Sequence, residues 1–311
     1  MMDVSIVFVN YKTNNLLFSA IESIKEKCHG CSYEIIVVDN SVDEIVFSEL
    51  EAKEKEYGYR LIKSPNNIGV GNGGNLGAKF SIGDYLLFLN SDIIMINDAI
   101  SELLNHIKND NEAGIVGGNL YTKDLTPNLT YFDEPINKYL MSKHFNYLFW
   151  IISKIKKKKS TFNTSNKPKK VSGMIIGAAL MISKTDFNIL GGFDKDIFMY
   201  GEEALLCYRV IHELGKNIVN IPSAKIIHLD GGSYTDANEK REKARVDGDF
   251  VFYTKAVGKE KAINIYRNLA KILQIKIFFR CFLKDKNLLK IMRLRRQLYL
   301  QKIDSQIALQ K

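Results

Sequence analysis

A polar triplet follows one of the most apolar segments of this 311-residue chain. The segment DYLLFL occupies residues 84–89, and Asn90, Ser91 and Asp92 come directly after it. A carboxylate at the end of a buried strand is suited to holding Mg²⁺ or Mn²⁺ against a diphosphate, because hard cations prefer oxygen ligands. The alternative for Asp92 is a turn or a helix cap. His228 ends a later apolar run, where a neutral imidazole could complete such a metal site or serve as a structural hydrogen-bonding group.

Two adjacent acids, Glu202 and Glu203, stand at the start of an expected helix over residues 203–214, which Gly215 ends. The positive end of a helix favours the ionised form of a carboxylate. An ionised carboxylate in a crevice can accept a proton from an attacking hydroxyl group. The alternative is that both acids only stabilise the first helical turn.

A third pattern has the wrong surroundings for its usual function. Gly69, Gly71 and Gly74 match the G-x-G-x-x-G fingerprint of dinucleotide binding. The fingerprint should follow its strand directly, but residues 64–67 intervene here. The first strand, which normally carries the motif, leads instead to Asn10 and Tyr11. The sequence therefore disfavours a nicotinamide cofactor.

Strands and helices must alternate in the first third of the chain to position these residues. Strands are expected over residues 4–10, 34–39, 59–63 and 84–90, with helices over 16–24, 45–57, 75–80 and 99–107. This order predicts an α/β fold with a mostly parallel central sheet and helices on both faces. Working residues in such sheets lie beyond the carboxyl ends of the strands, so Asn10, Asp39 and Asn90 should meet at one crevice.

The rest of the chain divides into three stretches. Residues 121–170 are expected to be a variable, partly flexible insertion. Order should resume with strands over 178–183, 218–221 and 225–228 and a loop over 187–200. We expect one α/β domain over residues 1–260 and a basic, amphipathic helical region over residues 261–311.

The net charge of +9 indicates an anionic partner such as nucleic acid, acidic lipid or a phosphate-bearing substrate. Eight lysines lie within residues 154–170, but no nucleic-acid recognition motif accompanies them. The chain shows neither a secretory signal nor an apolar run of the ~20 residues that span a bilayer, so a cytoplasmic location is expected. Four cysteines make no disulfide framework, and the C-x-x-C pair Cys28 and Cys31 is interpreted as structural.

Six segments in a fixed order resemble glycosyltransferase family 2 with the GT-A fold. They are VSIVFVNYK, EIIVVDNS, NNIGVGNGGNLG, DYLLFLNSD, GAALMISKTDFNILGGFDKDIFMYGEEALLCYRV and IIHLDGGS. The resemblance covers roughly residues 3–260 and is strongest to the bacterial rhamnosyltransferase-like branch, which builds surface polysaccharides. It implies a Rossmann-like nucleotide-binding half within the sheet.

The resemblance also implies a role for each matching residue. Asn10 and Asp39 would grip the nucleotide, with Asp39 accepting a hydrogen bond from a uracil or thymine base. The nucleotide-sugar would also contact Asn67, Gly74, Asn90 and Ser91. Asp92 and His228 would bind the divalent cation, Mg²⁺ or Mn²⁺.

The base in the family comes from the acid pair, and Glu203 matches it better than Glu202. The implied reaction is an inverting transfer from a UDP- or dTDP-sugar in a single displacement. Leu205 departs from the family, which often has a second acid at that position. That departure keeps open a catalytically weakened relative that binds glycan or membrane.

Acceptors in this branch are usually lipid-linked glycans at the inner face of the cell membrane. The basic segment 276–300 could lie on an anionic membrane surface as a peripheral anchor, with five apolar side chains inserted: Phe278, Phe279, Phe282, Leu288 and Leu289. The alternative is a basic helix packed on its own domain. The resemblance implies no nucleic-acid partner.

Overall fold

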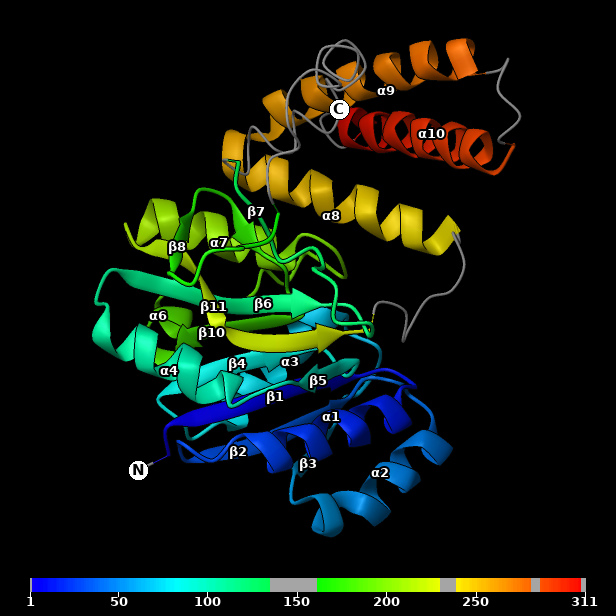
Figure 1. The fold of residues 1–311 in the computed structure, drawn as a ribbon. Helices are drawn as coiled ribbons and strands as arrows, with labels where there is room; N and C mark the ends of the chain where they lie inside the picture. Colours follow the sequence, from blue (N-terminus) through cyan, green and yellow to red (C-terminus); the bar gives the residue numbers. More distant parts are fainter. Residues whose placement is uncertain (1, 135–160, 230–238, 281–285, 309–311) are drawn as a thin grey trace. The chain divides into compact units, whose positions relative to one another are not determined.

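The computed structural model describes residues 2–134, 161–229, 239–280 and 286–308 (Figure 1). These residues belong to two compact units. The first unit comprises residues 2–134, 161–198 and 202–229, and the second comprises 199–201, 239–280 and 286–308. Most of the expected insertion and its lysine run, residues 135–160, lies outside the described residues. The domain boundary expected at residue 260 stays a prediction.

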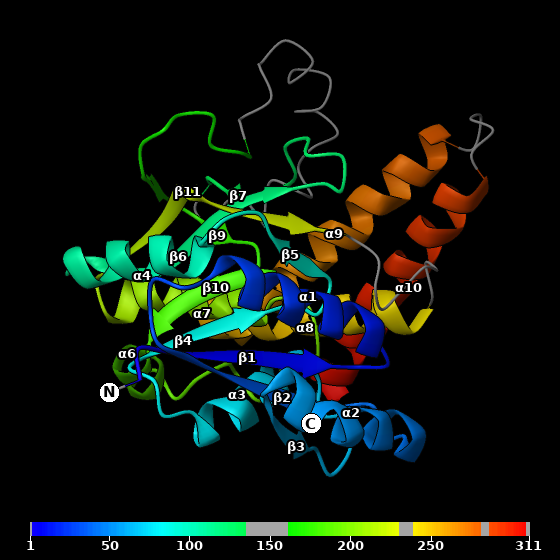
Figure 2. The same cartoon turned by 60° about the horizontal axis from the view of Figure 1, so that its bottom comes forward.

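A mixed sheet forms the centre of the first unit (Figure 1). Its strand order is β3 (Arg60–Lys63), β2 (Tyr33–Asp39), β1 (Val4–Asn10), β4 (Tyr85–Leu89), β10 (Ala179–Ser183), β6 (Ala113–Tyr121), β11 (Asn217–His228) and β5 (Ile93–Met95), with β8 (Lys169–Val171) also paired to β11. The strands from β3 to β4 are parallel, and β10 is antiparallel to both of its neighbours. Two short strands, β7 (Tyr131–Phe132) and β9 (Met174–Ile175), pair separately. Figure 2 turns the β3 edge toward the viewer.

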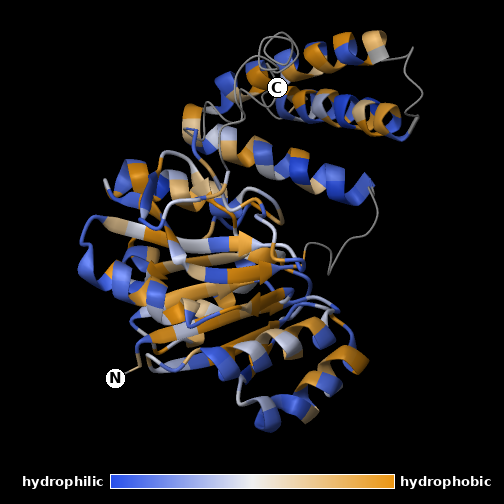
Figure 3. Ribbon diagram, in the orientation of Figure 1, coloured by the Kyte–Doolittle hydropathy of each residue, from blue (hydrophilic) through white to orange (hydrophobic). Residues whose placement is uncertain are grey.

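Helices cover both faces of this sheet because its strands are apolar on both sides (Figure 3). Alternate residues of β1 point to opposite faces. Ile6 and Phe8 share a core with α1 (Asn14–Lys27) and α4 (Ala99–Asn109), and α2 (Glu44–Tyr57) packs beside α1. On the other face, Val7 contacts α3 (Val70–Phe80). That helix also contacts α7 (Glu202–Glu213), and the short helix α6 (Lys184–Ile189) follows β10.

Helix α3 begins at Val70, five positions before residue 75, where the sequence predicted a helix to start. Glycine is a poor helix former, but here it allows the helix to approach the sheet closely. A Cβ atom on Gly73 would lie 2.6 Å from Val9 Cγ1, and one on Gly77 would lie 2.4 Å from Val7 Cγ1. Tertiary packing therefore overrides the local preference.

Two expected strands near residue 220 form one continuous strand, β11. Its pairing with β6 shifts register between Ile221 and Lys225, where the sequence predicted a break. The strand continues past this irregularity to His228, which stands opposite Ile93 of β5. The end of β11 therefore lies next to the segment that follows β4.

The second unit contains three helices, α8 (Glu239–Val257), α9 (Lys259–Arg280) and α10 (Lys286–Ala308). Its core is aromatic: the rings of Tyr266 and Tyr299 lie 4.8 Å apart, and the ring of Phe250 lies 5.0 Å from that of Tyr266. Arg295 pairs with Glu242 at 2.6 Å and joins α10 to α8. None of the described helices combines the length and apolar character needed to cross a bilayer.

Candidate active site

The ends of β1 and β2 bring the two predicted nucleotide-binding residues side by side. The parallel register places Asn10 opposite Asp39, and both side chains are buried. The Thr13 hydroxyl donates to Asn10 Oδ1 at 2.8 Å and lies 2.7 Å from Ser91 Oγ. Asp39 Oδ1 accepts the Ser41 backbone N–H at 3.1 Å. The polar ends of three strands therefore meet at one edge of the sheet, as the strand order predicted.

Asn40, which the sequence analysis did not single out, holds the loop after β3. Its Nδ2 donates to Asn67 Oδ1 at 3.0 Å and to Gly69 O at 3.3 Å, while its Oδ1 accepts the Ile68 N–H at 2.9 Å. Asn40 is 3% exposed, so these bonds replace those it would make with water. Asn40 therefore fixes Asn67 near Asp39. The available signal was its place directly after Asp39 at a strand end.

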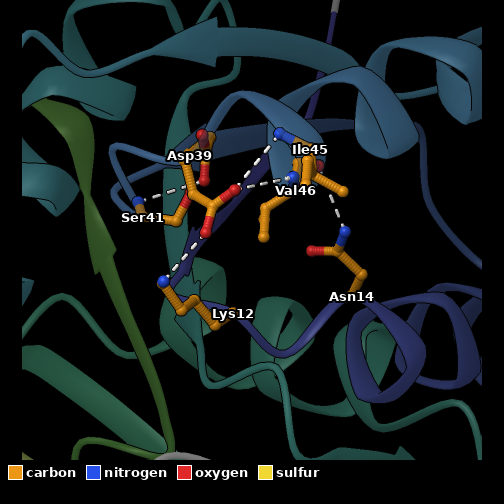
Figure 4. Close-up of polar contacts among 7 residues, drawn as sticks. Lys12, Asn14, Asp39, Ser41, Ile45 and Val46 are labelled. Carbon is orange, nitrogen blue, oxygen red and sulfur yellow. Dashed lines mark hydrogen bonds and ion pairs between the residues drawn. The ribbon is translucent and has the colours of Figure 1, made fainter.

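A hollow of about 310 Å³ opens between the start of α1 and α2, and its lining includes Lys12, Asn14 and Val46. Lys12 Nζ lies 2.9 Å from Asp43 Oδ2, and the dashed line drawn from Lys12 in Figure 4 marks this ion pair. The hydrogen bond from the Lys12 ammonium lowers the pKa of the Asp43 carboxyl. Asn14 Nδ2 donates to Val46 O at 3.2 Å (Figure 4). These contacts join the loop after β1 to α2.

Gly74 lies within α3, on the side that faces an aromatic cluster. A Cβ atom at this position would lie 3.0 Å from Phe193 Cε2 and 3.3 Å from Phe88 Cε1. The rings of Phe88 and Phe193 are themselves 4.8 Å apart. Gly74 thus serves close packing in this structure, and its contact with a nucleotide-sugar stays a prediction.

A second polar cluster forms where β4 ends. His228 Nε2 lies 3.4 Å from Asp92 Oδ1 and 3.4 Å from Asn90 Nδ2. The Leu229 N–H donates to the backbone carbonyl of Asp92 at 2.9 Å, which extends the pairing of the two chain segments. The side chains of Asp92 and His228 are each 12% exposed. The structure thus joins the two predicted metal ligands, although they are far apart in the sequence.

The two acids that open α7 have different neighbours. A Cβ atom on Gly71 would lie 3.2 Å from Glu202 Cβ, so Glu202 packs against α3 and is 9% exposed. A Cβ atom on Gly177 would lie 3.4 Å from both Cβ and Cγ of Glu203. Glu203 therefore extends along Gly177, which has no side chain to block it. These surroundings distinguish the acids but leave their catalytic roles as predictions.

The segment beside Glu203 is hydrogen-bonded to a residue of the second polar cluster. The Asn90 N–H donates to Ala178 O at 3.1 Å, and Ala178 directly follows Gly177. Asn90 also contacts His228 through its side chain. The acid at position 203 and the His228 cluster therefore adjoin the same short segment of chain.

The apolar residue at position 205 belongs to the core. Leu205 is 1% exposed, and its neighbour Cys207 is completely buried. Burial raises the pKa of the Cys207 thiol to about 12, with a smaller contribution from the nearby Glu203 charge. Both side chains therefore belong to the buried, apolar side of α7.

The C-x-x-C pair has the inert chemistry expected of structural thiols. Cys28 is 1% exposed, and burial raises the pKa of its thiol to about 12. Burial also raises the pKa of Cys31. Because the thiolate is the reactive form, both residues are protonated and unreactive at neutral pH.

The geometry of Asp92 and His228 fits a divalent cation that is also bound by atoms of a small molecule. Adjacent ligands of an octahedral ion lie about 3 Å apart, close to the 3.4 Å between Asp92 Oδ1 and His228 Nε2. Across the residues that the structure describes, no group of three or more His, Cys, Asp or Glu side chains could hold an ion alone. An ion here would therefore need oxygen atoms from a bound ligand, and diphosphate oxygens have the right chemistry.

Three glycosyltransferases are similar to this chain in sequence. The low-salt glycan biosynthesis hexosyltransferase Agl10 of Haloferax volcanii is 26% identical over 252 residues, which cover 80% of this chain and 73% of Agl10. The dTDP-rhamnosyl transferase RfbF of Shigella flexneri is 24% identical over 229 residues, or 73% of this chain and 68% of RfbF. The uncharacterized glycosyltransferase YfnE of Bacillus subtilis is 26% identical over 123 residues, so the match spans only 31% of YfnE.

A solved structure supports the fold independently. GalNAc-T7, crystallised with UDP, GalNAc and Mn²⁺, superposes with a TM-score of 0.58 at 15% identity. The superposition covers 82% of this chain and 50% of the GalNAc-T7 chain. This similarity confirms the GT-A type of α/β fold that the sequence predicted.

The family profile matches the part of the chain that contains strands β1, β2 and β4. The profile described as glycosyl transferase family 2 matches residues 5–188, from the first residues of β1 to the end of α6. The match includes Asn10, Asp39 and Asp92 and ends before Glu203 and His228. Because it covers more than half of the sequence, this chain belongs to glycosyl transferase family 2.

Proposed function

We propose that this protein is an inverting glycosyltransferase that moves a hexose from a UDP- or dTDP-sugar to a lipid-linked glycan acceptor in surface polysaccharide biosynthesis. The observation that carries the proposal is the placement of Glu203 beside Gly177, because the next residue, Ala178, accepts a hydrogen bond from Asn90, which in turn contacts His228. A proposed proton acceptor and a proposed pair of cation ligands are thereby linked by a short series of contacts. Transfer of a sugar from a diphosphate needs both.

Glu203 acts as the general base in this proposal. Its carboxylate takes the proton of an acceptor hydroxyl, and the hydroxyl oxygen forms a bond to the anomeric carbon. The bond from that carbon to the nucleotide diphosphate breaks on the opposite face, and the configuration inverts. Glu202, packed against α3, positions the start of α7.

Asp92 and His228 would hold the divalent cation, which when bound supplies positive charge to the departing diphosphate. Asn90 contacts His228 and orients its ring. The structure of GalNAc-T7 with UDP and Mn²⁺ supports the use of such an ion in this fold.

The carboxyl ends of β1 and β2, which we call the β1–β2 edge, bind the donor nucleotide. Asp39 accepts a hydrogen bond from the pyrimidine ring, and Asn10, Asn67 and Ser91 complete the polar surface. The name of RfbF, a dTDP-rhamnosyl transferase, supports dTDP-rhamnose as one donor, and that of Agl10 supports a hexose in general.

The second unit contacts an anionic membrane surface, which would place the protein at the inner face of the cell membrane. Ile275, Phe278 and Phe279 of α9 are 50%, 64% and 52% exposed. The sequence of α9 contains six basic residues and one acid, which favours anionic lipid. Leu289 does not fit the predicted insertion, because it is 9% exposed within the unit. Phe282 lies outside the described residues.

The proposal is tested first by binding. UDP, dTDP and a panel of their sugars are screened for thermal stabilisation with and without Mn²⁺. A ligand at 100 times its dissociation constant should stabilise the fold by about 2.7 kcal/mol. Transfer to a lipid-linked acceptor is then followed by nuclear magnetic resonance, which reports the anomeric configuration of the product. A retained configuration would contradict the single displacement. Stabilisation by none of these ligands would favour the catalytically weakened alternative.

A further inference from the structure

Two arginine side chains of α8 lie against one tyrosine ring in the second unit. Arg241 and Arg245 are four positions apart, so they share a helix face. The guanidinium carbon of Arg241 lies 5.8 Å from the centroid of the Tyr200 ring, and that of Arg245 lies 5.0 Å from it. The negative face of an aromatic ring attracts cations at such distances. Tyr200 therefore holds two positive charges near each other.

Two acids of α8 pair with cations other than these two arginines. Glu242 pairs with Arg295 at 2.6 Å, and Asp247 pairs with Lys302 at 2.6 Å. Within the described part of the chain, neither Arg241 nor Arg245 makes an ion pair with a carboxylate. Two adjacent cations without a carboxylate repel each other, and a bound anion would relieve that repulsion.

The backbone that presents the Tyr200 ring is strained. Tyr200 has a φ of 67°, in the left-handed region that an aromatic residue rarely adopts. Gly248 of α8 accommodates this turn, because a Cβ atom there would lie 2.1 Å from Tyr200 O. Strained backbone of this kind is found preferentially at ligand and active sites. In the chain, Tyr200 also stands three residues before Glu203.

We infer that Arg241, Arg245 and Tyr200 bind the diphosphate group of an amphiphilic acceptor substrate. A guanidinium has five N–H donors, and attraction to a ring face does not use them as hydrogen bonds to an acceptor, so they can bind phosphate oxygens. Two guanidinium groups near one ring can bind two linked phosphates. The site is formed wholly within the second unit.

The amphiphilic character follows from the exposed residues of α9 in the same unit. Phe278 and Phe279 can contact a hydrocarbon chain or the membrane that holds it, while the arginines contact the diphosphate. This inference rests on the proposed function, which assigns the donor's diphosphate to Asp92 and His228 and gives the arginines no role.

The test uses farnesyl diphosphate as the probe, with farnesol as the comparison, and EDTA present to exclude binding through a cation. Calorimetry of the full chain should give a dissociation constant that rises at least about tenfold in the double variant Arg241→Gln/Arg245→Gln, because two charge-assisted contacts are lost. The matched control is Lys261→Gln/Lys271→Gln, which removes the same charge from exposed positions of α9 and should bind nearly as wild type. Tyr200→Phe should retain binding, and Tyr200→Leu should weaken it.

Three results would overturn the inference. Equal weakening in both double variants would indicate general charge attraction, and equal binding of farnesol would remove the diphosphate from recognition. The third result is an arginine variant that no longer binds UDP or dTDP with Mn²⁺ but binds farnesyl diphosphate as the wild type does. That result would show that the arginines bind the donor. Failure of the proposed function is distinct: the wild type would bind farnesyl diphosphate but neither UDP nor dTDP.

Discussion

The two polar clusters at the carboxyl ends of the sheet are built differently. At the β1–β2 edge, Asn40 and Thr13 make hydrogen bonds of 2.7 to 3.3 Å with their neighbours. At the end of β4, His228 Nε2 lies 3.4 Å from both Asp92 and Asn90, near the outer limit of hydrogen bonding. The first edge is held by short hydrogen bonds within the chain, whereas these two contacts of His228 are longer. Binding and chemistry should therefore respond separately to substitution.

The largest difference between the effect on transfer and the effect on nucleotide binding is expected at Glu203. Glu203→Gln should lower the transfer rate by about 10²- to 10⁴-fold, the usual contribution of a general base, and leave UDP or dTDP binding intact. Steady-state transfer and calorimetric binding measure the two effects. Glu213→Gln, an exposed acid of the same helix paired with Arg209, is the control. Full turnover in the Glu203 variant would remove this residue from the reaction.

Asp92 tests the second cluster directly. Asp92→Asn should lower the apparent Mn²⁺ affinity, measured in the presence of UDP or dTDP, by about 10- to 100-fold. Even residues that only contact a metal ligand have effects of that size. The matched control is Asp110→Asn, because Asp110 lies 3.6 Å from His106 in a similar pair on α4. If both variants behave alike in a manganese titration, the cation is not held at Asp92.

Asn40 tests the β1–β2 edge. Asn40→Ala leaves the Ile68 N–H and the Asn67 side chain without their partner, and should destabilise the fold by about 1–3 kcal/mol. The donor KM should rise more than kcat falls, because the residue positions the binding loop. Thermal unfolding and donor titration report both changes. The exposed Asn105→Ala on α4 should change neither, and an unaltered KM at Asn40 would end its positioning role.

The β1–β2 edge was predictable from sequence, since β-branched runs that end in Asn10 and Asp39 reveal both the strands and their polar ends. Asn40 was not, because its function depends on contacts with residues 27 and 29 positions away. The start of α3 was missed for a similar reason: glycines indicate a loop locally, and only packing against Val7 and Val9 explains the helix.

At the second cluster, spacing alone could not place Asp92 beside His228. The chemistry of the two side chains suggested the pair and the family resemblance also implied it, and the antiparallel pairing of β5 with β11 supplies the contact. The different surroundings of Glu202 and Glu203 depend on Gly71 and Gly177, which no local pattern connects to α7.

The smallest effect is expected from the ion pair that borders the first edge. Lys12 and Asp43 are 49% and 31% exposed, so solvent screens their attraction. Lys12 lowers the pKa of Asp43, so the pair stabilises the fold above the ordinary aspartate pKa and this contribution disappears as pH falls through the lowered value. Thermal unfolding of wild type and Lys12→Met should differ slightly at neutral pH and converge in acid. A difference that grows in acid would contradict this sign.

The partners at the end of β4 stand 138 positions apart in the chain. The ribosome makes about 5–20 residues each second, so on the order of ten seconds separates Asn90 from His228 during synthesis. Strands β1, β2 and β3 can already pair in that interval. The nascent chain would thus pair the strands that carry Asn10 and Asp39 well before Asn90 and Asp92 meet His228, and a polypeptide released early would keep the first contact without the second.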